Sequence, residues 1–168
     1  IDGKSPAAAR QEIVDVLARR FAATRGAINN IETHASSAES IGNACVLRAE
    51  YQLDDGSSSD MAAVRSCLER TLAADPSNSD ANALLARVLI APEVAAGDAT
   101  VRARALGLAN RAVSIAPMSD RAHVALMMAQ FADGRIDAAL QAGNRAISLN
   151  PSNPDAVAKF ASVLFSVG

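Results

Sequence analysis

Apolar side chains recur along this chain at intervals of three and four residues, with polar residues between them. Ile13, Leu17 and Phe21 show this spacing near the N-terminus, and later segments repeat it. Such spacing places the apolar side chains on one face of an α-helix. The pattern predicts helices over residues 6–23, 40–53, 61–75, 79–90, 99–115, 120–131, 136–149 and 154–167, with a short helix or an extended link over 27–40. The alternating apolar and polar runs of a β-sheet are absent, so we expect an all-α protein.

Residues typical of turns and helix caps separate these segments. Ser59 or Asp60 is placed to cap the helix that follows it, and Ser79 the next one. Gly134 can turn the chain between two helices because glycine tolerates a positive φ. The segment 54–60 has the oxygen content of a calcium loop, but it lacks the alternating acidic spacing and the closing glutamate. We interpret it as a solvated turn and predict no metal site there.

Three of the predicted helices end in the same way, with small apolar residues in the last turn and then a proline. The segments are 67–76, 109–117 and 143–151. Pro117 and Pro151 are 34 residues apart, and Pro76 and Pro117 are 41 apart, which is the same period with an insertion of seven. Two helices closed by a proline every 34 residues resemble the tetratricopeptide repeat (TPR) family. The resemblance implies a TPR-type α-α superhelix, a right-handed solenoid of antiparallel helix pairs.

The third repeat fixes the register of this resemblance. With Asp120 as its first position, the residues that match the family pattern are Leu126, Gly134, Ala139, Ala146 and Pro151. The departures are His123, Gln130 and Gly143, the last at a place where a large ring is common.

The register also predicts the domain organisation. We expect an N-terminal helix and link over 1–37, followed by a TPR-like array over 38–168. Its repeats span about 41–78, 79–119 and 120–153, with a partial fourth over 154–168. The helix over 6–23 is expected to pack on the first helix pair.

A narrower resemblance rests on the segments 44–51, 64–70, 75–76, 145–151 and 164–168. Together they are similar to the C-terminal repeat region of bacterial regulators whose N-terminal output domain is a winged-helix DNA-binding domain or resembles an adenylate cyclase. The resemblance implies that the repeats sense or recruit a partner, while output lies elsewhere in a longer protein. The compartment stays open between the bacterial cytoplasm and, given an upstream membrane span, the periplasm.

Composition narrows the functions that remain. The 168 residues carry a net charge of −2, which gives no basic field for nucleic acid. No apolar run reaches the roughly 18 residues needed to span a membrane. The chain begins at Ile1 without a methionine or a leader, so we expect it to be a piece of a longer protein. There is no phosphate-binding glycine loop, no nucleophile elbow and no histidine beyond His34 and His123, so we predict no enzyme, no cofactor and no metal.

Two residue types leave alternatives open. His123 stands where an aromatic ring usually packs inside the repeat, and we favour a helix-packing role over a pH-sensing or ligand-binding one. Cys45 and Cys67 fall on the paired helices of the first repeat, where a bridge is sterically conceivable. We favour two buried, reduced thiols. A disulfide would point instead to an oxidising compartment such as the periplasm.

Stacked repeats form a concave wall from the first helix of each pair. The outward places of those helices hold Asp80, Ala83, Arg87, Ile90, Arg121, Val124, Met128, Phe131, Asp155, Ala158, Ser162 and Phe165, with Lys159 beside them. We predict that Arg87, Arg121, Met128, Phe131 and Lys159 bind a protein or peptide with apolar anchors and possible acidic character. Phe131 and Phe165 are equally compatible with packing against the next helix. Chaperone-adaptor repeats bind the terminal carboxylate of a partner with Lys and Asn side chains at set positions. Here Ala83 and Val124 occupy the fifth positions, so we do not favour a partner of that class.

Three function classes remain. The first is a protein–protein interaction or sensory module of a bacterial signalling or transcription regulator, and we favour it. The second is a self-association domain that gives a homo-oligomer through residues 13–21 or through the end near Gly168. The third is a small-ligand-binding or enzymatic groove in the concave wall.

Overall fold

The structure is a computed structural model of the chain, and it describes residues 5–21, 40–55, 60–91 and 98–168. All secondary structure in these ranges is helical, which confirms the all-α prediction. The helices are α1 (Pro6–Phe21), α3 (Asn43–Asp55), α4 (Met61–Ala74), α5 (Ser79–Leu89), α7 (Ala99–Ile115), α8 (Asp120–Ala132), α9 (Ile136–Leu149) and α10 (Pro154–Val167). Among these residues no helix is both long and apolar enough to cross a membrane.

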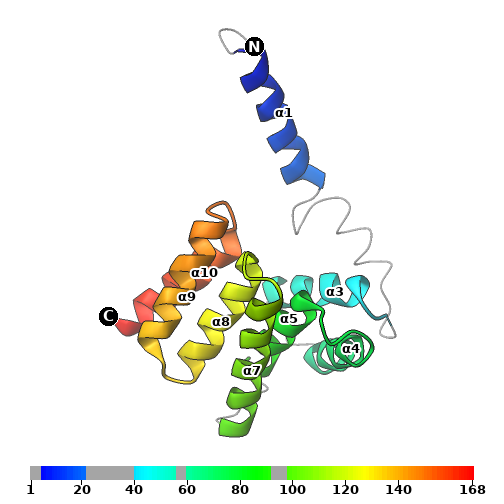
Figure 1. Ribbon diagram of the computed structural model, residues 1–168, viewed down its shortest axis with the longest axis vertical. Coiled ribbons are helices and arrows are strands. Elements are labelled where there is room, and N and C mark those ends of the chain that lie inside the picture. The colour runs from blue at the N-terminus through cyan, green and yellow to red at the C-terminus, as the bar shows by residue number, and fades with distance from the viewer. Residues whose placement is uncertain (1–4, 22–39, 56–59, 92–97) are drawn as a thin grey trace.

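Successive helices pack as pairs, and the pairs stack into one array (Figure 1). The pairs are α3 with α4, α5 with α7, and α8 with α9, and α10 packs on both α8 and α9. Gly134 has φ +78° in the turn between α8 and α9, as the sequence predicted. The array is a TPR-type helical solenoid.

Small side chains allow this close stacking. The buried core runs from α3 to α8 and includes Ala81, Ala105 and Ala109, each fully buried. A second cluster joins α8, α9 and α10. There the Phe160 ring of α10 lies over Gly143 of α9, so Phe160 occupies the space that a ring at position 143 would need.

The first helix departs from expectation. Figure 1 shows α1 apart from the array, and Ile13 and Leu17 are 58% and 49% exposed. The prediction that this helix packs on the first pair is therefore wrong, because its apolar face is uncovered. The predicted element over 27–40 lies almost wholly outside the described residues.

The cap of α5 differs from the sequence prediction, and Asp60 does not cap α4. Asn78 caps α5, its side chain accepting a hydrogen bond from the Ala81 amide at 2.9 Å. Ser79 instead donates to the Ala112 carbonyl at 3.1 Å and so ties α5 to α7. Asp60 precedes α4, but its carboxylate pairs with Arg48 of α3 and makes no cap. The alternative cap, Ser59, lies outside the described residues.

Cys45 of α3 and Cys67 of α4 form a disulfide, with their Cα atoms 5.9 Å apart. Each residue is only 1% exposed. The favoured interpretation of two reduced thiols is wrong, because the antiparallel packing of α3 on α4 brings both side chains to the same height.

Candidate functional site

The predicted partner-binding residues lie on neighbouring helices. The first helices of successive pairs, α3, α5, α8 and α10, contact one another, and we call their shared face the first-helix wall. Arg87 belongs to α5 and Lys159 to α10. Arg121, Met128 and Phe131 belong to α8, between those two helices.

Arg87 is buried in this wall, not exposed on it. Its side chain is 3% exposed, and its two terminal nitrogens lie 3.1 and 3.3 Å from the two carboxylate oxygens of Asp155 on α10. The expectation of an outward-pointing side chain is therefore wrong at this position. The ion pair links α5 to α10 across the intervening helix α8.

Arg121 bridges two carboxylates. Its Nη2 lies 2.7 Å from Glu50 Oε1 on α3, and its Nη1 lies 2.7 Å from Asp80 Oδ1 on α5. Burial by itself would lower the pKa of Arg121, but the charges of Glu50 and Asp80 outweigh it and raise that pKa. The guanidinium therefore stays charged and is already engaged by the protein's own acids.

These internal ion pairs were not predicted from the sequence. The second position of successive repeats carries Asp80, Arg121 and Asp155, so the sign of the charge alternates along the wall. That alternation could have indicated the Asp80–Arg121 pair between adjacent repeats, but not the pairs that Arg87 and Glu50 form.

Met128, Phe131 and Lys159 remain partly exposed. Met128 and Phe131 pack beside Phe160 against the cluster that joins α8, α9 and α10. Lys159 forms no ion pair with any residue in the described ranges. The adjacent helices α8 and α10 therefore offer partly exposed apolar surface and a cation without a described ionic partner.

Other residues assigned to the wall differ sharply in exposure. Ala83 and Val124 are fully buried and offer no side chain to a partner. Phe165, near the end of α10, is 92% exposed, so its ring is almost entirely open to solvent.

His123 has a structural role in the described fold. It is 9% exposed, and its Nε2 lies 3.0 Å from the carbonyl oxygen of Pro117. Asn82, at the same place in the preceding repeat, donates from Nδ2 to the carbonyl oxygen of Pro76 at 3.2 Å. Both side chains hold the proline turn against the next helix, which supports the helix-packing interpretation.

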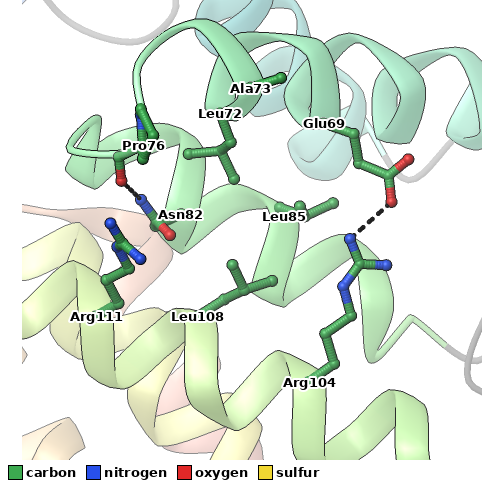
Figure 2. Close-up of a pocket in the computed structure, with 9 residues that line it drawn as sticks. All are labelled: Glu69, Leu72, Ala73, Pro76, Asn82, Leu85, Arg104, Leu108 and Arg111. Atoms are coloured by element: carbon green, nitrogen blue, oxygen red, sulfur yellow. Dashed lines mark hydrogen bonds and ion pairs between the residues drawn. The ribbon is translucent and has the colours of Figure 1, made fainter.

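A pocket of about 460 Å³ lies where α4, α5 and α7 meet (Figure 2). We call it the outer pocket, because α4 and α7 are the second helices of their pairs. Its lining residues are Glu69, Leu72, Ala73, Pro76, Asn82, Leu85, Arg104, Leu108 and Arg111. The sequence analysis did not indicate this site, since its residues come from three separate helices. No group of three potential metal ligands occurs among the residues that the structure describes.

Comparison with known proteins identifies the fold. No protein-family model matches the chain, and no curated protein matches it. The thermophilic TPR protein TTC0263 of Thermus thermophilus is similar in structure, with a TM-score of 0.62 and 19% identity over 95% of this chain and 80% of that one.

Two further solved structures share the arrangement. The first TPR domain of Spaghetti (RPAP3), bound to the HSP90 peptide SRMEEVD, has a TM-score of 0.53 and 18% identity over 73% of this chain and 90% of that one. A Thermobaculum terrenum O-GlcNAc transferase mutant has a TM-score of 0.58 and 21% identity over 82% of this chain but only 23% of that one. At these identities the similarity establishes a TPR fold.

Proposed function

We propose that this chain is a non-catalytic protein-binding module that holds a peptide segment on its first-helix wall. The fold supports this proposal, because the similar Spaghetti domain is bound to a peptide. Stacked helix pairs present an extended surface that suits an extended or helical segment.

The chemistry of the wall defines the peptide. Met128 and Phe131 offer partly exposed apolar contacts, and Lys159 offers a cation without a described ionic partner. Arg87 and Arg121 are already paired, so a peptide acid would meet Lys159 first. A second acid would have to displace Glu50 or Asp80 from Arg121. We therefore expect apolar anchors with one acidic group.

The observation that carries this proposal is that Met128 and Phe131 of α8 and Lys159 of the adjacent helix α10 are all partly exposed. Its test begins with peptides selected from a random phage-displayed library against the whole chain. The selected peptides should carry apolar residues and an acidic one. Amide chemical shifts on titration should change along α8 and α10.

Lys159→Glu should weaken binding of a selected acidic peptide by about fivefold to tenfold, the effect of one partly exposed ion pair turned repulsive. Fluorescence anisotropy with the labelled peptide measures this. Arg145→Glu makes the same charge change on the exposed surface of α9 and should leave the affinity unchanged. Equal effects of the two variants, or shifts confined to other helices, would refute the assignment of this surface.

A more specific proposal is that this chain is part of a longer protein. The resemblance to bacterial regulators supports a role as the sensory or recruiting part of a larger signalling protein. Sequencing the gene on both sides of this segment tests it. A flanking winged-helix or cyclase-like domain is expected, and a different neighbouring domain would contradict it.

Self-association is the second candidate, and the exposed apolar side chains favour it. Ile13 on α1 and Phe165 on α10 are 58% and 92% exposed. A molar mass that rises with concentration in light scattering would support this candidate. A constant monomer mass would exclude it over the range measured.

A further inference from the structure

The outer pocket has an apolar middle and two different ends. Figure 2 shows Leu72, Leu85 and Leu108 converging between α4, α5 and α7. Glu69 and Arg104 flank one end, and Arg111 lies toward the other, near Pro76 and Asn82. A cavity of about 460 Å³ is within the range of about 300–1,000 Å³ that is typical of ligand pockets.

Positive charge predominates around this pocket. Glu69 Oε1 accepts hydrogen bonds from Arg104 Nη2 at 3.0 Å and from Arg65 Nε at 3.2 Å, so one carboxylate is shared by two guanidinium groups. Arg111 is exposed and forms no ion pair with a described residue. The lining therefore has two cations, Arg104 and Arg111, and one acid, Glu69, on a chain whose net charge is −2.

This combination is specific to the first repeat junction. Counted from the repeat prolines, the next junction has Asn110 in place of Glu69, Ala138 in place of Arg104 and Ala142 in place of Leu108. Arg111 keeps its counterpart, Arg145. The Arg at this place therefore belongs to the repeat pattern, whereas the leucine and the second cation distinguish the pocket.

We propose that the outer pocket is a second peptide-binding site, which takes an apolar side chain of a partner protein together with an adjacent carboxylate. The apolar side chain packs against the partly exposed Leu72 and Leu108, above the buried Leu85, and the carboxylate pairs with Arg111. Charge complementarity selects this occupant, because Arg111 is a cation with an open partner position beside apolar surface. The site is formed by α4, α7 and the Asn82 and Leu85 side of α5. It includes none of the residues assigned to peptide binding on the first-helix wall, so it stands or falls independently of the function proposed above.

The test uses the whole chain and two peptides. The probe is acetyl-Gly-Glu-Leu-Leu-Glu-Gly-amide, and its control has Gln in place of both Glu residues. Amide NMR shifts on titration should map to residues that line the pocket on α4 and α7. The Glu peptide should bind about fivefold more tightly than the Gln peptide, as expected for one exposed ion pair worth about 1 kcal/mol.

Arg111→Gln should abolish the difference between the two peptides, whereas Arg145→Gln should preserve it. Arg111 and Arg145 are both exposed, so neither change is expected to unfold the protein. Shifts confined to α8 and α10, no binding, or an equal preference in both variants would overturn the proposal. Shifts at the pocket that grow with protein concentration alone would identify a second copy as the occupant, and would overturn it as well.

Discussion

Individual ion pairs connect helices that are distant along the chain. Asp155 pairs with Arg87, whose side chain is 3% exposed, whereas the Asp155 side chain is 24% exposed. Removing the acid leaves a guanidinium in a site from which water is largely excluded. Such an unpaired charge is costly, because its desolvation is no longer offset by a nearby opposite charge.

Asp155→Ala is therefore expected to lower the free energy of unfolding by about 3 kcal/mol, the lower end of the range for breaking a buried pair. Asp137→Ala is the matched control. Asp137 also lies in the first turn of its helix, α9, but it is exposed. Its loss should cost only about 0.5 kcal/mol, through the helix dipole. Urea denaturation measures both, and similar losses would show that the Arg87 pair contributes little.

Side-chain caps define where several helices begin, and the residues at helix contacts determine how closely the helices pack. Asn78, Asp98, Ser119 and Asn153 each accept a backbone hydrogen bond at the start of a helix. The hydrogen bonds from the side chain and amide of Thr100 lower the pKa of the Asp98 carboxyl.

Between α9 and α10 the close contact depends on the absence of a side chain at Gly143. A Cβ atom there would lie 2.7 Å from Met127 Sδ, and would overlap the Phe160 ring.

Gly143→Ala should consequently destabilise the protein and loosen α10, although alanine favours a helix over glycine by about 1 kcal/mol. Overpacking typically costs about 1–3 kcal/mol, which exceeds that gain. Gly107→Ala in α7 separates the two effects, because a Cβ atom at 107 has no neighbour within 4 Å. Thermal unfolding should show a lower Tm for the first variant and a higher Tm for the second. A raised Tm in both would mean that Phe160 moves aside freely.

At the scale of the whole molecule, the first pair is joined covalently and the remaining pairs by packing. The Cys45–Cys67 disulfide links α3 to α4 over a sequence separation of 22 residues. In the chain-entropy account, such a cross-link stabilises the fold by restricting the unfolded chain. The disulfide lies at the end of the array formed by α3 and α4. Glu50 of the same helix α3 forms the ion pair with Arg121.

Reducing this disulfide should lower the stability of the chain by about 3 kcal/mol. Chemical denaturation with and without dithiothreitol measures the change. The double variant Cys45→Ala/Cys67→Ala should resemble the reduced protein and show no response to dithiothreitol. An unchanged midpoint for the wild-type chain under reduction would contradict a stabilising bond.

The repeat, the fold class and most helix positions follow from local patterns in the sequence. The helices predicted over 99–115, 136–149 and 154–167 have those bounds in the structure. Capping, helical spacing and the proline period are local properties of the sequence. Each helix pair packs on its neighbours in the same way, so these local patterns are enough to predict the repeat fold.

Which of the predicted site residues are engaged in ion pairs depends on contacts between helices that are far apart in the chain. Arg87 and Asp155 are 68 residues apart, and Arg121 and Glu50 are 71 apart. The disulfide and the uncovered face of α1 likewise depend on how whole helices are placed. Such contacts arise from the summed geometry of several helix pairs, which no local pattern encodes. Charge pairing across two repeats therefore engages Arg87 and Arg121, whereas Lys159 forms no ion pair with a described residue.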